Sequence, residues 1–275
     1  MPRDQMKLVH TLDEIIVVHN EFRDHIADLC HGEHETRFDP LFTIVLLKTF
    51  NFCFNTYKAI GLLLPDRHYE NGGALLRVMW EATLNLAWVA AGPLERSRAF
   101  LQFTVVETHR FRQGRVRELE ALGDSEHAAQ TRQDLTEFEK AYGEILEEFR
   151  NAGRGGKRLA QRFSSSNLES LAVEIGENWL AEYRGIYPLL CAFAHGSPGV
   201  VLFPLPVVKD FRELDIDAIA RTEEPRTVDL ALWSMSVMER SYSALLQATG
   251  TADDAYLDEL DRRTSFRSSM SRTTA

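Results

Sequence analysis

Cysteine is scarce in this chain of 275 residues, and no disulfide or metal-binding cysteine pattern is visible. The three cysteines, Cys30, Cys53 and Cys191, lie far apart and form no CxxC pair. Such usage is typical of a protein in a reducing compartment. The first residues also lack the apolar segment of a signal peptide. We therefore expect a cytoplasmic protein with free thiols.

Positive charge is in the minority. The chain has 31 Lys and Arg against 41 Asp and Glu, which gives a formal net charge of -10. Nucleic acid binding depends on clustered cations that neutralise phosphates, and an acidic chain repels the phosphate backbone. The composition therefore disfavours nucleic acid as a partner and leaves a small ligand or another protein.

An uninterrupted apolar run long enough for a membrane span is also missing. The closest candidate, residues 41–64, is interrupted by Lys48, Asn51, Asn55 and Lys58. Their spacing places all four along one side of a helix. Because charges at the centre of a bilayer are costly, we predict a core helix with a polar stripe and no membrane partner.

Signals of a β-sheet are absent, and helical periodicity takes their place. The predicted helices cover about 11–30, 40–65, 69–91, 94–122, 125–150, 166–195 with a break near Gly176, 225–249 and 252–262. Three prolines in residues 197–212 predict an extended connection lying on the core. We predict an all-α multi-helix bundle, with a single domain over residues 1–262 and a disordered tail over 263–275.

Arg77 and Glu81 stand out in the apolar stretch GGALLRVMWEATLNLAWVAAG, residues 72–92. Their spacing of four places them on the same helix face. A buried charge must be paired and hydrogen-bonded, so we expect this pair to be either an internal brace or part of a binding or catalytic site. Gly72 and Gly73 at the start of this helix predict a close approach of another element.

A second stripe of polar residues lies in YRGIYPLLCAFAHG, residues 183–196. Tyr183, Tyr187, Cys191 and His195 follow each other at steps of four and form one slanting stripe on a helix. His195 precedes Gly196, a residue typical of helix ends, and its imidazolium would be stabilised there by the helix dipole. We predict either a simple helix cap or a polar cluster with Arg77 and Glu81.

These two segments resemble a bacterial all-helical family of unknown function. That family shows an Arg-x-x-x-Glu helix and a later tyrosine-containing helix that ends in histidine. Arg77, Glu81, Tyr187 and His195 match this pattern. The resemblance covers roughly residues 40–200, and the family is similar to HEPN-type domains, some of which are ribonucleases of toxin and defence systems. It implies a HEPN-like fold and a homodimer.

The chain departs from HEPN ribonucleases at their Arg–His motif. In those enzymes an arginine precedes the histidine by four to six intervening residues, and Pro188, Leu189 and Leu190 stand at these positions before His195. The sequence therefore leaves three alternatives open: a binding or regulatory domain of unknown ligand, a divergent HEPN-type ribonuclease or toxin, and an accessory protein-interaction module.

No cofactor or metal site is predicted. GRGGKR, residues 153–158, lacks the Ser or Thr that follows the lysine of a P-loop, and GxSxG is absent. The histidines His19, His25, His31 and His34 show no ligand spacing, and we interpret them as exposed polar residues. The candidate catalytic residues are Arg77, Glu81 and His195, and the candidate binding residues add Tyr183 and Tyr187.

Overall fold

The computed structural model describes residues 11–30, 39–151, 159–160, 162–163, 167–196, 216–250 and 253–264. Over these residues the chain forms ten helices and no strand, which confirms the all-α prediction. The helices are α1 (Leu12–Cys30), α2 (Pro40–Leu63), α3 (Tyr69–Ala90), α4 (Pro93–Ala121), α5 (Ser125–Asn151), α6 (Leu168–Ile175), α7 (Glu177–Gly185), α8 (Tyr187–Ala194), α10 (Ile216–Thr249) and α11 (Asp254–Thr264).

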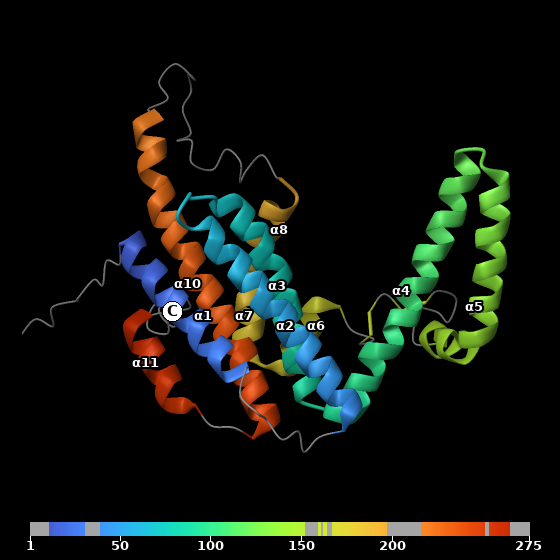
Figure 1. Cartoon of the computed structure of the whole chain (residues 1–275), viewed down its shortest axis with the longest axis horizontal. Helices are drawn as coiled ribbons and strands as arrows, with labels where there is room; N and C mark the ends of the chain where they lie inside the picture. The colour runs from blue at the N-terminus through green and yellow to red at the C-terminus, as the bar shows by residue number, and fades with distance from the viewer. Residues whose placement is uncertain are drawn as a thin grey trace, which may run out of the picture.

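The main core lies around α3, which packs against α2, α8 and α10 (Figure 1). Its largest buried side chains include Trp80, Tyr57 and Tyr242. The predicted close approach at the start of α3 is confirmed. A Cβ atom on Gly72 would lie 2.3 Å from a Leu230 methyl of α10, and one on Gly73 would lie 2.5 Å from the Phe193 ring of α8. Glycine thus lets both helices pack closely on α3.

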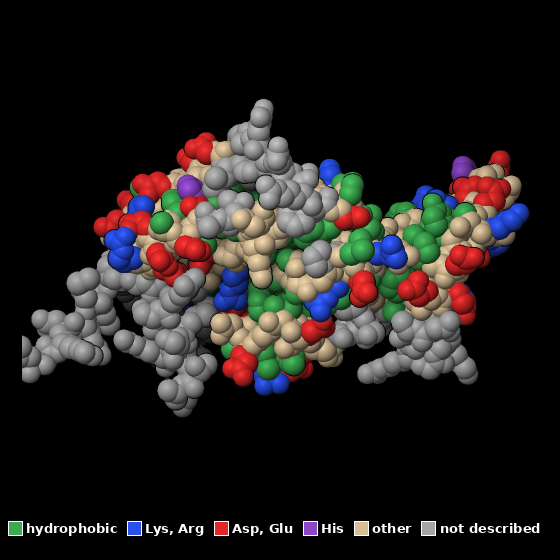
Figure 2. Space-filling model, turned by 90° about the horizontal axis from the view of Figure 1, so that it is seen from below, with side chains coloured by type: hydrophobic (Ala, Val, Ile, Leu, Met, Phe, Trp, Pro, Cys, Tyr) green, Lys and Arg blue, Asp and Glu red, His purple; other side chains and the backbone are tan. Residues whose placement is uncertain are grey.

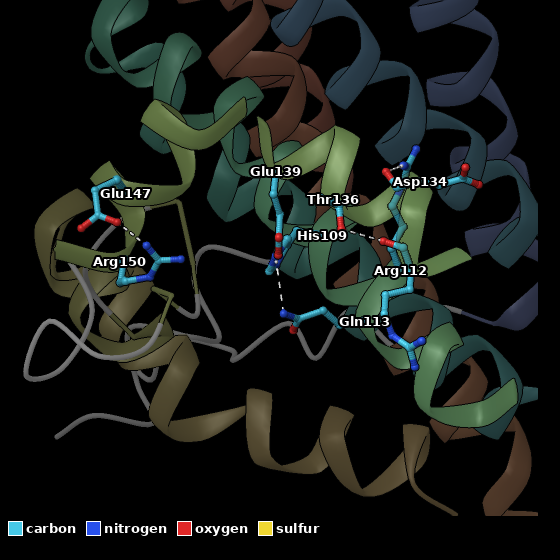
Figure 3. Close-up of polar contacts among 9 residues, drawn as sticks. His109, Arg112, Gln113, Asp134, Thr136, Glu139, Glu147 and Arg150 are labelled. Carbon is cyan, nitrogen blue, oxygen red and sulfur yellow. Dashed lines mark hydrogen bonds and ion pairs between the residues drawn. The ribbon is translucent and has the colours of Figure 1, made fainter. Parts of the chain in front are cut away.

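Helices α4 and α5 form a long hairpin that extends away from the bundle (Figure 1). The hairpin has its own small core of Phe103, Val106, Leu146, Phe149 and Ala160. Polar contacts join the two helices beyond this core (Figure 3). His109 of α4 contacts Glu139 of α5, with 2.8 Å between Nε2 and Oε1. The helix predicted at 125–150 is therefore the outer, largely exposed helix of this hairpin.

The stretch predicted as one interrupted helix from Ser166 is divided into three helices. Asn167 is the residue that caps α6, since its side chain accepts a hydrogen bond from the Ser170 N–H at 2.8 Å, while Ser166 lies outside the described residues. Gly176, with φ of 150°, separates α6 from α7 as predicted. A second break falls at Ile186, directly before Tyr187 and Pro188, because proline prefers the first turn of a helix.

The predicted start of the long C-terminal helix is wrong. Helix α10 begins at Ile216, and Pro225 lies inside it. The fixed φ of proline is helical, so a helix can continue through it at the cost of a backbone hydrogen bond. Helix α11 extends to Thr264, two residues beyond the predicted domain boundary. The predicted connection at 197–212 and residues 265–275 lie outside the described residues.

Helix α2 carries the predicted polar stripe. Lys48, Asn51, Asn55 and Lys58 are all exposed, whereas the opposite face of the helix, with Phe50 and Tyr57, is buried. Among the helices that the structure describes, none has both the length and the apolar character needed to cross a membrane.

Candidate functional site

A polar cluster lies where α3 meets α7 and α8. Arg77 and Glu81 of α3 form an ion pair with 3.1 Å between Nε and Oε1, and their side chains are 25% and 30% exposed. The Tyr187 hydroxyl of α8 donates a hydrogen bond to the same Glu81 oxygen at 2.6 Å. Tyr187 therefore meets Arg77 and Glu81, which lie over a hundred positions earlier in the chain, and the sequence had singled out all three residues.

Aromatic rings form the wall beside this cluster. Tyr187 stacks on Tyr183 with ring centroids 5.2 Å apart and an interplanar angle of 19°. The Arg77 guanidinium carbon lies 5.8 Å from the centre of the Tyr187 ring, within the range of a cation–π contact. Trp80 lies behind, with its ring centroid 4.9 Å from that of Tyr187. Tyr183 thus contributes to the site by stacking on Tyr187.

Arg162 is a second cation of this site that sequence reasoning missed. Its Nη2 donates to Asn85 Oδ1 on α3 at 3.4 Å. Burial lowers the pKa of Arg162, while electrostatic interactions with Glu81 and Tyr187 act in the opposite direction, so the guanidinium lies within electrostatic range of both residues. Arg162 lies between α5 and α6, outside every predicted helix, so no periodic pattern marks it.

The cluster has a surplus of positive charge. It contains two guanidinium groups and one carboxylate, and the Nε–H of both Arg77 and Arg162 is buried with no hydrogen-bond acceptor among the described residues. For Arg77 this holds despite the short distance to Glu81, because the hydrogen is not directed at that oxygen. A buried donor without an acceptor is costly and rare, so both arginines have unused capacity to bind an anion.

The ionisation of the cluster is set by burial and by these contacts. Burial and the hydrogen bond to Glu81 raise the pKa of Tyr187 well above its usual value, so the hydroxyl remains a donor at neutral pH. Burial alone would lower the pKa of Arg77, but the neighbouring Tyr187 and Glu81 outweigh it and raise that pKa. The guanidinium stays charged, and its pairing with Glu81 holds it in place.

His195 lies apart from these contacts. It caps α8 through its backbone N–H, which donates to Cys191 O at 3.1 Å, and Gly196 follows with φ of 57° as expected of a helix end. Its side chain is exposed. Eight residues of helix separate it from Tyr187, a rise of about 12 Å. Within the described part of the chain, no hydrogen bond or ion pair joins it to Arg77 or Glu81.

The buried Arg–Glu pair of the bundle is a different one. Glu182 of α7 is 6% exposed and accepts hydrogen bonds from Trp80 Nε1 at 3.1 Å and from Arg240 Nη1 of α10 at 2.6 Å. Arg240 also lies over the Trp179 ring, 4.9 Å from its centre. This brace ties α3, α7 and α10 together, and sequence reasoning missed it because its members are not close in the sequence.

The N-terminal histidines form no ligand set within the described residues, where no group of three His, Cys, Asp or Glu side chains is arranged to hold a metal ion. His31 and His34 lie outside those residues. The interpretation of His19 as exposed is wrong, since it is 1% exposed and stacks on Tyr57 with ring centroids 3.9 Å apart. His25 instead pairs with Asp253 before α11 at 2.7 Å.

The fold and this cluster define an all-helical domain with a half-buried, cation-rich polar site between α3 and α7–α8. Its sequence places it further: the chain belongs to a family of unknown function (DUF5677), whose profile matches residues 43–202. That range contains Arg77, Glu81, Arg162 and Tyr187. No curated protein and no solved structure matches the chain.

Proposed function

We propose that the chain is a helical binding domain, and that Arg77, Arg162, Glu81 and Tyr187 hold a small ligand through its carboxylate or phosphate group. The observation that carries this proposal is the surplus of guanidinium groups, two against one carboxylate, with both Nε–H donors buried and without an acceptor in the described structure. The surplus is local, because the chain as a whole has a formal net charge of -10.

The geometry supports an anion rather than a cation or a neutral molecule. Guanidinium groups bind carboxylate and phosphate oxygens through parallel N–H donors, which gives both strength and orientation. Glu81 and Tyr187 hold Arg77 in one position, so less side-chain entropy is lost when a ligand binds. The stacked pair Tyr183 and Tyr187 offers a flat surface for the body of the ligand. His195, at the far end of the same stripe, is the outermost residue that an elongated ligand would reach.

Variants of the two arginines test this proposal. We expect inorganic phosphate or succinate at millimolar concentration to raise the melting temperature of the wild-type protein. Arg77→Met and Arg162→Met keep much of the apolar stem and should each weaken binding tenfold or more, as measured by calorimetric titration. Arg184→Met is the matched control, because Arg184 is 64% exposed and pairs with Glu169 at the surface. Equal binding by all four proteins would refute the proposal.

The HEPN-type ribonuclease remains the second candidate, and the exposure of His195 favours it, since a general base must reach its substrate. The charge of the surface counts against it. The face shown in Figure 2 mixes acidic and basic side chains over its described surface, whereas an RNA-binding face is expected to be basic. Incubation with single-stranded RNA decides between the candidates. Cleavage that His195→Ala abolishes would establish the nuclease, and equal background cleavage would exclude it.

The third candidate is an accessory interaction module that acts as the expected homodimer, and the α4–α5 hairpin is the part that favours it. Phe111 and Leu122 on this hairpin are 75% and 73% exposed. Large apolar side chains at such exposure are typical of surfaces that contact another protein when they lie together. Light scattering at micromolar concentration measures the mass directly. A dimer that Phe111→Ser converts to monomer would support this role, and a monomeric wild type would count against it.

A further inference from the structure

A cavity lies on the opposite side of α8 from the Arg77 cluster. Its volume is about 110 Å³, and residues of α3, α8 and α10 line it. Leu189 and Phe193 of α8 line it, whereas Tyr187 and Cys191 of the same helix face the Arg77 cluster. Positions 189 and 193 point roughly opposite to 187 and 191 on a helix of 3.6 residues per turn. The cavity is therefore a separate site.

The walls of the cavity are apolar and aromatic, with two charged groups at one side. Tyr69, Phe193 and Trp233 supply the rings, and Arg226 and Asp229 of α10 supply the charges. Arg226 is engaged with the wall: its Nη1 donates to the Tyr69 hydroxyl at 3.1 Å, and its guanidinium carbon lies 5.5 Å from the centre of that ring. A few converging polar groups in an apolar cavity are the usual arrangement of a small-molecule site.

Asp229 is the charged group of this cavity that has no structural role in the described fold. The residue is exposed at the edge of the cavity, and among the described residues it has no hydrogen bond and no ion pair. Burial raises its pKa, with no opposing contribution from a neighbouring cation. A carboxylate that lines an apolar cavity and has no partner is free to pair with the cationic group of a ligand.

The volume limits the size of the ligand. A cavity of about 150 Å³ in another protein holds benzene, with its six heavy atoms. By proportion, 110 Å³ encloses roughly four or five heavy atoms. A branched aliphatic group of this size fills the space between the rings, and a single polar group can extend to Asp229.

We propose that this cavity binds a small branched aliphatic molecule that carries a primary ammonium group, with the ammonium paired to Asp229. Two sources share this chemistry: a free alkylamine, and an aliphatic α-amino acid whose carboxylate lies toward Arg226. This inference is independent of the anion site proposed above, because the two sites share no lining residue.

Three probes of the same shape separate the contributions. Isobutylamine carries the ammonium, isobutanol replaces it with a neutral hydroxyl, and L-valine adds a carboxylate. In calorimetric titrations of the full chain we expect isobutylamine or L-valine to bind at least tenfold more tightly than isobutanol. Tighter binding of valine identifies an amino acid as the ligand class, and tighter binding of isobutylamine identifies a free amine.

Two variants and a control make the result specific. Asp229→Asn keeps the shape of the side chain and should remove the preference for the ammonium probes, whereas Asp258→Asn on the exposed face of α11 should leave it unchanged. Leu189→Trp fills the cavity and should abolish binding of all probes. Arg77→Met should bind the amine normally, which separates this inference from the anion site. Isobutanol binding as tightly as both ammonium probes, unchanged binding by Asp229→Asn, or no binding of any probe overturns the proposal.

Discussion

The buried brace of Glu182, Arg240 and Trp80 gives the sharpest prediction about stability. Glu182→Gln keeps the size of the side chain and an acceptor for the Trp80 N–H, but it removes the negative charge that faces Arg240. Removing one partner of a fully buried pair costs about 3–5 kcal/mol, because an uncompensated charge remains. The Arg240 side chain is 25% exposed, so water relieves part of this cost. We expect a loss of about 2–3 kcal/mol in the free energy of unfolding.

Thermal and urea unfolding followed by circular dichroism measure this loss. For a chain of this size, each kcal/mol lowers the melting temperature by about 2–4 °C, so Glu182→Gln should melt roughly 5–10 °C below the wild type. The matched control is Glu169→Gln, which breaks the pair with Arg184 at the surface, where the two side chains are 42% and 64% exposed. Exposed pairs contribute less than about 1 kcal/mol, so this variant should melt less than about 4 °C below the wild type.

A double variant tests the reason for the loss. If the cost comes from the unpaired guanidinium, replacing Arg240 with Met in the Glu182→Gln background should restore part of the stability. Melting temperatures of Glu182→Gln and Glu169→Gln that agree within error would refute the reasoning. The same holds if the double variant is as unstable as the sum of the two single variants.

Two further predictions concern a buried histidine of α1 and two helical glycines. Burial lowers the pKa of His19 from 6.5 to about 3, so the unfolded chain binds a proton there that the native chain excludes, and stability falls as the pH drops from about 6.5 toward 3. Between pH 7.5 and 5 the free energy of unfolding should fall by about 2 kcal/mol on account of His19, and His19→Leu should remove this part of the pH dependence. A variant whose stability falls with pH as steeply as that of the wild type would contradict the prediction. Gly72→Ala should destabilise by about 1–3 kcal/mol because its Cβ would meet Leu230, whereas Gly114→Ala, with open space around it on α4, should stabilise by about 0.5–1 kcal/mol in urea unfolding.

Local signals in the sequence account for most of the fold. The capping box at Thr11 is present, since the Thr11 N–H donates to Glu14 Oε2 at 2.9 Å. Asp39 caps α2 by accepting from the Leu41 N–H at 2.8 Å. Gly176 and Gly196 end their helices as predicted. All these signals act within a few residues, which is why they can be recognised without a structure.

The candidate site was predictable only in part, because only contacts between residues close in the sequence leave a recognisable pattern. Arg77 and Glu81 are one helical turn apart, so their pairing follows from spacing alone. The contact of Glu81 with Tyr187 was a hypothesis that depended on two distant helices meeting. Arg162 and the Glu182–Arg240 brace depend entirely on how the helices pack, and no local pattern in the chain encodes that packing.

The contacts of α8 also explain why a brace and a binding site are hard to tell apart here. A helix of eight residues has little stability of its own, so α8 is held by its packing on α3, through the Tyr187 hydrogen bond at one end and Phe193 against Gly73 at the other. A brace between α3 and α8 needs Arg77, Glu81 and Tyr187 and nothing more. Arg162 is superfluous to it, because a second guanidinium within electrostatic range of an already paired carboxylate adds desolvation without a carboxylate of its own to pair with. That extra charge is what distinguishes an anion site from a simple brace.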